Sequence, residues 1–352
     1  MTDDTIRKTA PTIRDVARKA GVSTASVSRV LNKREVITDD LYFRVTAAIQ
    51  ELGYRPQRNR ARPATPSPWL FVLTETIDDP FFLQIISGIQ EKAEEEGFLP
   101  TILPISSRRN RLADTLEQLK SQPSVGILAA GVYLKPEEWI DYQTEINVPI
   151  VVINTRITHP RIASVMVDFE AASYQATQHL LSLNHTRIAF VGNYDNEFAA
   201  AELQGVKSAL ATRGIDYPDE YRFSVTHTPE GASQAISKMM LLPAEKRPTA
   251  IFAFDDQLAI LVLNAMRYYR LRVPEDISVI GFDNIPMSAH SNPPLTTIDI
   301  PKRRIGRMMV MMIQDLLSRE KDEDGLGTTI IEGSLIVRSS TGPAPTLNGM
   351  EK

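Results

Sequence analysis

The chain has 352 residues, too many for one ordinary hydrophobic core, so we expect two or three domains. Its content of 43% hydrophobic and 23% charged residues is typical of a soluble globular protein. The absence of cysteine excludes disulfides, thiolate metal sites and cysteine nucleophiles, and the five histidines lie too far apart to predict a metal site. Neither a secretory signal nor a membrane-spanning run is recognisable, so we expect a cytoplasmic protein.

The charges are unevenly distributed around a net charge of −4. Residues 1–62 contain 13 Lys and Arg against 7 Asp and Glu, whereas the rest of the chain contains 26 against 36. A small basic segment on a large acidic body indicates that only the first segment meets a polyanion such as nucleic acid. The alternative is an ordinary solvated basic face.

Three short helices are predicted before residue 54, each with a capping residue and apolar residues at helical spacing. Thr12, with Asp15 three residues later, has the spacing of a capping box, and Gly21 ends this first helix. Ser23 caps the second helix and Thr38 the third. The short connection between the first two helices predicts a helix-turn-helix, whose second helix lies in the major groove of DNA. A three-helix module that binds a protein is the alternative.

The start of the second helix presents short hydroxyl side chains followed by one arginine. Short hydroxyls let the backbone approach DNA closely, and an arginine can bond a phosphate or the edge of a guanine. The exposed residues predicted here are Ser23, Thr24, Ala25, Ser26, Ser28 and Arg29.

Residues 55–68 are rich in arginine and proline and cannot build a core, so we predict a linker at 59–68 beside the basic head. From Trp69 onward, short apolar strands alternate with amphipathic helices, which predicts parallel sheets covered by helices. This α/β region is too long for one doubly wound domain, so we expect two similar lobes with a ligand in the cleft between them. The predicted strands are 69–74, 101–105, 125–130, 149–154, 164–168, 187–192, 249–254 and 277–283, and the helices include 82–96, 112–120, 171–183, 199–213 and 257–269.

Residues 12–32, TIRDVARKAGVSTASVSRVLN, resemble almost position for position the head of the LacI/GalR family of lac-repressor and purine-repressor type regulators. The resemblance continues in ELGYRP at 51–56 and in the body, in LNHTRIAFVG, RVPEDISVIGFDNIP and PPLTTI. It implies a helix-turn-helix head and two doubly wound lobes of periplasmic-binding-protein type. It also implies a homodimeric repressor whose affinity for a near-palindromic operator is changed by a small molecule between the lobes.

The resemblance also implies a division of the chain into domains. The tail lacks leucine heptads, so we expect no helical tetramerisation segment. The expected division is a DNA-binding domain at 1–58, the linker, an effector-binding and dimerisation domain at 69–340 and a tail at 341–352; the N-lobe comprises about 69–167 and 299–326, and the C-lobe about 168–298 and 327–340.

The resemblance gives roles to residues of the head. Thr24 and Ala25 occupy the two positions that select the operator in this family, and their methyl groups suit a thymine methyl. Arg29 matches a base or phosphate contact, and Tyr54 a residue that supports the head on the DNA backbone. The full set expected to contact DNA is Thr12, Ile13, Arg14, Ser23, Thr24, Ala25, Ser28, Arg29, Asn32, Thr38, Tyr54, Gln57, Arg58, Arg60 and Arg62.

The linker departs from the family pattern. Pro63 stands where the family has a leucine that wedges into the minor groove, and Arg60 replaces the preceding alanine. Proline cannot join the interior of a hinge helix, although a prolyl ring can still wedge between base steps. The alternative, which the sequence favours, is an extended basic arm in the minor groove formed by Arg58, Arg60 and Arg62.

In the body, candidate ligand residues follow the strands. The resemblance points most strongly to Asp283, and then to Asp255, with its neighbour Asp256 in a structural role. Phe81 and Phe82 follow the first strand, where an aromatic ring can stack on a sugar or a base or simply pack at the start of its helix. The effector-binding candidates are Phe81, Phe82, Arg156, Asn196, Phe198, Glu202, His227, Asp255 and Asp283.

Glu202 is the sharpest departure in the body, because the family usually has a ligand-binding arginine at this position. Several carboxylates near one another make an anionic ligand improbable. Three interpretations stay open. The ligand is cationic, such as an amine, amino sugar or nucleoside base, or it is a neutral polyol, with Arg156 supplying a cation. In the third, Glu202 simply pairs with an arginine, or the cleft has lost its ligand. His227 lies where some relatives have an aromatic residue, or is a plain surface histidine.

Other classes of protein fit less well. A solute-uptake binding protein would suit the body alone, and an architectural DNA binder would suit the head alone. The sequence shows no phosphate loop or catalytic triad, so we expect neither an enzyme nor a cofactor. The methionines at 308, 309, 311 and 312 predict a core or dimer-contact stripe.

Overall fold

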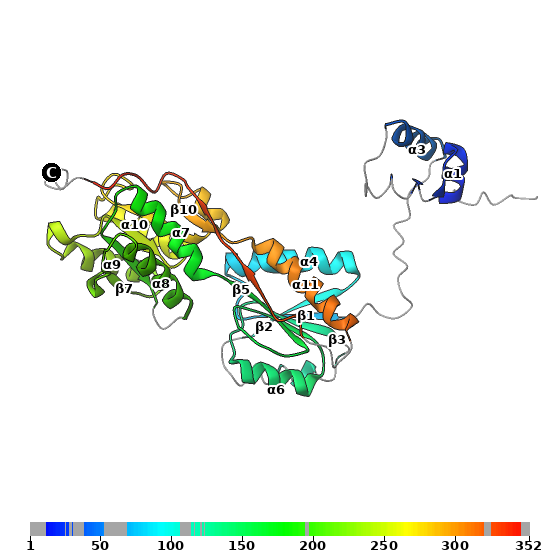
Figure 1. Cartoon of the computed structure of the whole chain (residues 1–352), viewed down its shortest axis with the longest axis horizontal. Helices are drawn as coiled ribbons and strands as arrows, with labels where there is room; N and C mark the ends of the chain where they lie inside the picture. The colour runs from blue at the N-terminus through cyan, green and yellow to red at the C-terminus, as the bar shows by residue number, and fades with distance from the viewer. Residues whose placement is uncertain are drawn as a thin grey trace, which may run out of the picture. The chain divides into compact units, whose positions relative to one another are not determined.

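The computed structural model describes residues 12–24, 26–27, 30, 39–52, 69–105, 114–115, 117–119, 122, 124–193, 197–319 and 325–345 (Figure 1). The chain forms two units, Met1–Pro66 and Ser67–Lys352. No helix among these residues is long and apolar enough to cross a membrane.

The first unit contains α1 (Ile13–Ala20) and α3 (Asp39–Leu52). The first helix begins and ends where the sequence predicts: Asp15 accepts hydrogen bonds from the backbone N–H and the hydroxyl of Thr12, and Gly21 ends the helix with φ +66°. The hydroxyl of Thr12 therefore donates to Asp15. The small core of this unit contains Val16, Ala17, Ala20, Val27, Val30, Val45 and Ala48.

The second unit contains two α/β lobes, as the alternating pattern predicts. The described strands form two sheets of six, in the orders β11-β5-β4-β3-β1-β2 and β12-β10-β9-β8-β6-β7. Every pairing is parallel except that of β12 with β10. The strands are β1 (Trp69–Thr74), β2 (Leu99–Pro104), β3 (Ser124–Ala129), β4 (Ile150–Ile153), β5 (Ile162–Val167), β6 (Ile188–Gly192), β7 (Arg222–Ser224), β8 (Ala250–Ala253), β9 (Ser278–Asp283), β10 (Thr296–Asp299), β11 (Thr328–Ile331) and β12 (Ser334–Ile336).

Helices cover both faces of each sheet. In the first lobe, α4 (Pro80–Glu96) packs beside α11 (Lys302–Ser318), and α6 (Pro136–Ile146) covers the opposite face with the fully buried Trp139 (Figure 1). In the second lobe, α7 (Phe169–Ser182) and α8 (Glu197–Ala211) form one layer. The opposite layer consists of α9 (Pro229–Met240) and α10 (Asp256–Tyr268). Met309 and Met312 of the methionine stripe are core residues of α11, whereas Met311 is exposed.

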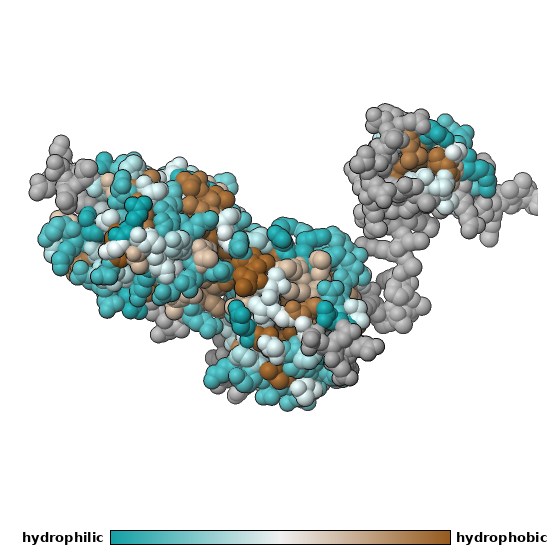
Figure 2. All heavy atoms as spheres, viewed as in Figure 1, coloured by the Kyte–Doolittle hydropathy of each residue, from teal (hydrophilic) through white to brown (hydrophobic). Residues whose placement is uncertain are grey.

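In the described part of the chain, the polypeptide passes between the lobes three times, after β5, β10 and β11. The expected return to the C-lobe at residue 327 is wrong by a few residues, because Thr328–Ile331 pairs with β5 and extends the first sheet. On the face shown in Figure 2, hydrophobic side chains gather where the two lobes join, and most of the remaining surface of both lobes is hydrophilic. The lobes are therefore joined by a short apolar hinge region.

Three 3-10 turns complete the second lobe. They are η1 (Asp219–Tyr221), η2 (Ala244–Lys246) and η3 (Pro286–Ala289).

Candidate functional site

The described part of the helix-turn-helix presents a short polar surface after Gly21. Ser23 and Thr24 are both exposed. The Ser23 hydroxyl accepts a hydrogen bond from the backbone N–H of Ser26 at 3.1 Å, which satisfies one of the free donors at the start of the second helix. Ser23 thus acts as the predicted N-cap immediately before the exposed Thr24.

Arg44 of α3 forms hydrogen bonds with the backbone of this turn, a role that the sequence did not reveal. Its guanidinium donates to the carbonyl of Ala20 at 2.7 and 3.2 Å and to that of Gly21 at 3.1 Å. These are the last carbonyls of α1 and its cap, which have no partner inside the helix. The angle between the first two helices is therefore fixed partly by a side chain of the third.

Many predicted DNA contacts cannot be placed. For Ile13 and Arg14 the structure describes only the backbone, within α1. The predicted contacts outside the described residues are Ala25, Ser28, Arg29, Asn32, Thr38, Tyr54, Gln57, Arg58, Arg60 and Arg62, as is Pro63 of the linker.

A pocket of about 800 Å³ lies between the two lobes of the body. Three aromatic rings line it: Tyr133 follows β3 in the first lobe, and Phe169 and Phe198 begin α7 and α8 in the second. The centroid of the Phe198 ring lies 5.0 Å from that of Tyr133 and 5.2 Å from that of Phe169, onto which it stacks. The two lobes therefore contribute to one continuous aromatic wall.

Charged side chains surround the opening of this pocket. The exposed Arg156 lies among the lining residues, as predicted, together with Lys135 from the same lobe. Asp168, Glu170 and Glu197 line it from the second lobe. Asn196, also a candidate, lies outside the described residues.

The two phenylalanines after β1 occupy different environments. Phe81 is only 7% exposed and belongs to the core of the first lobe, with the Phe82 ring edge-on at 5.1 Å. Phe82 is half-buried and lies against Gly131. The structure thus places Phe81, a predicted ligand residue, in a packing role, and leaves Phe82 as the more accessible ring.

Asp255 and His227 form a pair at the carboxyl ends of the second sheet. Nε2 of His227 lies 2.8 Å from Oδ2 of Asp255, while Oδ1 of Asp255 accepts the backbone N–H of Leu258 as the N-cap of α10. The hydrogen bond to Asp255 raises the pKa of His227, which favours the imidazolium form. The histidine is therefore more than a plain surface residue, since it compensates the charge of Asp255.

Glu202 lies on α8 with 1% of its surface exposed. No described residue donates a hydrogen bond to its Oε2, so the expected alternative of an arginine partner has no support among these residues. Burial raises the pKa of Glu202 well above its usual range, and the nearby carboxylates of Asp283 and Asp255 raise it further. The structure thus brings together three of the predicted acids.

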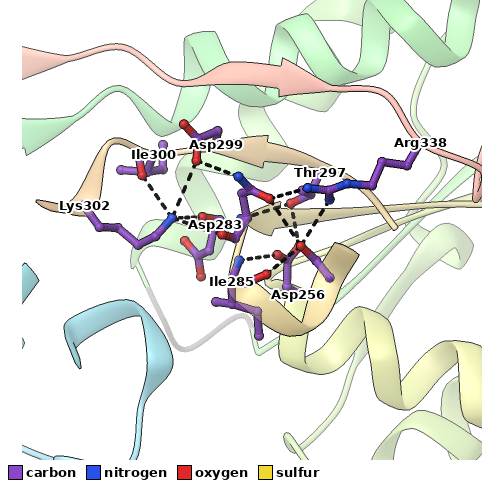
Figure 3. Close-up of polar contacts among 10 residues, drawn as sticks. Asp256, Asp283, Ile285, Thr297, Asp299, Ile300, Lys302 and Arg338 are labelled. Atoms are coloured by element: carbon purple, nitrogen blue, oxygen red, sulfur yellow. Dashed lines mark hydrogen bonds and ion pairs between the residues drawn. The ribbon is translucent and has the colours of Figure 1, made fainter. Parts of the chain in front are cut away.

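Asp256 has the structural role expected of it. It is fully buried, and its carboxyl accepts the backbone N–H of Ile285 at 2.8 Å and the hydroxyl of Thr297 at 2.5 Å (Figure 3). Gly281 is required beside it, because a Cβ there would overlap Oδ1 of Asp256. Burial raises the pKa of Asp256 to about 7, although these hydrogen bonds oppose the shift.

Lys302 connects the lobes beside this network and was missed in the sequence. Its buried ammonium donates to the carbonyls of Asp283 and Ile300 and lies 3.8 Å from Oδ1 of Asp299 (Figure 3). Asp283 and Asn284 have φ values of +100° and +52°, a strained backbone that these contacts hold in place. The sequence did contain a signal for this role, because a lysine in the first turn of a helix such as α11 is disfavoured by the positive end of the helix dipole.

The carboxyl of Asp283 completes this part of the cleft. Burial and the nearby Asp255 and Asp256 raise its pKa, whereas Lys302 opposes the shift. Burial likewise lowers the pKa of Lys302, against the attraction of Asp283. The two groups therefore form a mutually compensating pair at the second crossing between the lobes.

Comparison with known proteins identifies the family. Residues 12–57 match "Bacterial regulatory proteins, lacI family", and residues 177–341 match a periplasmic binding protein-like domain. The transcriptional repressor CytR of Escherichia coli (strain K12) is 33% identical over 343 residues, which cover 96% of this chain and 98% of CytR. The chain belongs to the LacI family. The repressor PurR of Aliivibrio fischeri (strain MJ11) is 32% identical over 315 residues, 89% of this chain and 93% of PurR.

Solved structures of LacI-type regulators share the fold. A complex of the transcriptional regulator CelR with cellobiose has a TM-score of 0.68 and 25% identity, over 94% of this chain and 99% of that one. The lac repressor dimer bound to operator and the anti-inducer ONPF gives the same TM-score and identity, over 95% and 100%. These matches confirm the predicted head and two-lobed body, and this LacI-family protein is a DNA-binding transcriptional regulator.

Proposed function

We propose that the chain is a homodimeric cytoplasmic repressor whose two heads bind the halves of a near-palindromic operator, and that a small molecule between the lobes changes its operator affinity. The observation that carries the second part is the pocket itself. Its aromatic wall is built from both lobes, with Tyr133 of the first facing Phe198 of the second at 5.0 Å. A ligand that touches both rings favours one angle between the lobes.

Such a ligand can act on DNA binding only through its different affinity for two arrangements of the lobes. Among the described residues, three chain crossings, the contacts of Lys302 and the contact of Tyr133 with Phe198 join the lobes. A coupling free energy of about 1–3 kcal/mol between effector and operator is typical of such systems. No covalent step is required, so we infer a binding protein rather than an enzyme.

Operator choice depends in this proposal on Thr24 and Ala25. Exposure of Thr24 after the Ser23 cap supports this role. Their methyl groups suit thymine methyls, whereas long polar side chains at these positions would read other base edges. The remaining expected contacts, from Thr12 to Arg62, position the head and the arm on the phosphates.

The linker is proposed to act as a basic arm. Pro63 disfavours a regular hinge helix, and the arginines at 58, 60 and 62 are suited to a narrow minor groove. A prolyl wedge is the second candidate, because proline is among the side chains that insert between base steps.

Selection of genomic DNA fragments by the purified full chain, followed by sequencing, tests the operator proposal. We expect a recurring two-fold symmetric site that binds two chains, as measured by sedimentation. The double variant Thr24→Tyr, Ala25→Gln should select a different site under the same conditions. Absence of enrichment, or an unchanged site in the double variant, would contradict the proposed reading head.

The ligand belongs to one of two classes in this proposal: a sugar or polyol, or a cationic amine or nucleoside. The aromatic wall suits both, because sugar faces and planar bases stack on aromatic rings. The solved structure of the related regulator CelR is a complex with cellobiose, which favours a sugar. The acidic residues Glu202, Asp255 and Asp283 favour the second class.

A further inference from the structure

We propose that the ligand of the cleft carries a cationic nitrogen, as a protonated amine or an amidinium-like group, which binds the carboxylate of Glu202. This inference rests on the proposed function, because it assigns a ligand chemistry to the same cleft.

Glu202 is buried and is not itself among the lining residues, but it lies next to residues of α8 that are. It lies on α8, one residue after Ala201 and one turn after Phe198, and both of these line the pocket. Its carboxyl interacts electrostatically with Asp283 and Asp255, which end β9 and follow β8. Carboxyl ends of parallel strands are where ligands of such sheets bind.

Within the described part of the chain, Glu202 is the acid of this group that lacks a compensating cation. Asp255 has the imidazole of His227 at 2.8 Å, and it also caps α10. Asp283 has the ammonium of Lys302, which opposes the rise of its pKa. For Glu202, the groups that act on the carboxyl are themselves acids, and its Oε2 has no hydrogen-bond donor. The cleft therefore contains one buried carboxyl without a cationic partner.

A buried polar atom without a partner is costly, and a buried unpaired charge costs more. A hydroxyl of a neutral sugar can form a hydrogen bond with the carboxyl of Glu202, but it does not offset the burial and the neighbouring acids that raise the pKa of Glu202. A cationic nitrogen supplies both the donor and the opposite charge, and charge-assisted hydrogen bonds are about twice as strong as neutral ones.

The aromatic wall favours the same class. The ring centroids of Tyr133 and Phe169 lie 5.0 and 5.2 Å from that of Phe198. The faces of aromatic rings attract cations, as in sites that recognise ammonium ligands. An anionic ligand is disfavoured by both the acids and the rings.

Benzylammonium and the neutral benzyl alcohol are probes of nearly equal shape that test this chemistry on the full chain. Isothermal titration should show that the wild-type protein binds benzylammonium about tenfold or more tightly than benzyl alcohol, a typical effect of one charge-assisted hydrogen bond. Glu202→Gln keeps the shape but cannot ionise to pair with a cation, and it should reduce this preference to about threefold or less. Glu230→Gln, on the exposed first turn of α9 in the same lobe, removes one charge away from the pocket and should keep the preference.

Equal binding of the two probes, binding of neither, or loss of the preference in both variants would overturn the proposal. Thermal unfolding of each variant verifies that it is folded, and Glu202→Gln should unfold at or above the wild-type temperature, because it removes an unpaired buried acid. Operator binding is measured separately: a chain that binds its operator but not benzylammonium retains the proposed function and loses this inference. A chain that shows the Glu202-dependent preference but binds no operator supports this inference and contradicts the proposed function.

Discussion

The ammonium of Lys302, the first residue of α11, donates a hydrogen bond to the main-chain carbonyl of Asp283 at the end of β9. The first residue belongs to a helix of the N-lobe and the second to a strand of the C-lobe. This contact joins the lobes at the point where the cleft has its strongest candidate ligand residue. A change in the angle between the lobes therefore has to be accommodated around Lys302.

Lys302→Met should destabilise the body by about 3 kcal/mol, because it leaves the carbonyls of Asp283 and Ile300 without their donor in a buried site. Arg303→Met is the matched control, since the exposed Arg303 pairs with the exposed Glu91 and its loss should cost less than about 1 kcal/mol. Urea unfolding followed by tryptophan fluorescence measures both. Equal losses in the two variants would contradict the role of Lys302.

Arg44→Met should loosen the head without affecting the body. The carbonyls of Ala20 and Gly21 lose their donor, at a cost of about 1–2 kcal/mol. Hydrogen exchange of the α1 and α3 amides in the full chain should therefore become about tenfold faster. Arg18→Met, which removes an 81% exposed side chain, should leave the exchange unchanged. Unaltered protection in Arg44→Met would show that the helices hold their angle without it.

Asp256→Asn should remove a pH dependence of stability. The folded pKa of about 7 exceeds the unfolded value of 3.8, so the contribution of Asp256 is fully present below pH 3.8 and is lost as the pH rises through about 7. Asparagine can still accept from Ile285 and bond Thr297. Between pH 5 and 8 the wild type should lose on the order of 2 kcal/mol relative to the variant in urea unfolding. A difference independent of pH would contradict the assigned shift.

Replacing Arg58, Arg60 and Arg62 with glutamine tests the basic arm. Each phosphate contact contributes about 0.9 to the slope of log affinity against log salt, so the triple variant should lower this slope by up to about 3. If the arm touches phosphates alone, the affinity of the triple variant should fall equally on all DNA sequences. If the arm enters the minor groove, the affinity should fall more on sites with a narrow central minor groove. An unchanged slope would favour the prolyl wedge of Pro63.

Gly306→Ala should destabilise the N-lobe by about 2–3 kcal/mol. A Cβ at this position of α11 would overlap the carbonyl of Ile85 in α4, and these helices cannot separate without opening the core. Gly97→Ala is the control: nothing lies near its Cβ, and the left-handed φ of +80° costs about 1 kcal/mol. Chemical denaturation of both variants measures the difference, and a smaller loss for Gly306→Ala would show that the helices adjust.

The strands of the body could be predicted because buried parallel strands are nearly continuous apolar runs. β7, β10, β11 and β12 were not predicted, since these strands of three or four residues are too short to show such a run. The sequence therefore predicted that the chain returns to the C-lobe at residue 327, before β11, whereas it returns after β11. Sheet order and the three crossings depend on contacts between distant segments, which a single sequence does not display.

For the cleft, Asp255 and Asp283 were predicted from the family resemblance together with the rule that ligands bind at the carboxyl ends of strands. Arg156 was predicted as the cation for a polyol ligand, and it lines the pocket. The same rule would have found Tyr133, which follows β3. It could not show that His227 pairs with Asp255, 28 residues away along the chain. Nor could it show that a buried carboxyl on α8 is left without a cation, because that depends on every side chain packed around it.

The most direct test of ligand control is the operator affinity of the full chain, measured by fluorescence anisotropy with amino sugars, nucleosides, polyamines and neutral sugars in turn. The account predicts that at least one cationic member of this set changes the affinity by about 5- to 150-fold at saturation, and that Glu202→Gln abolishes the change. It would be contradicted if operator affinity stayed constant with every compound, or if the neutral sugars alone changed it.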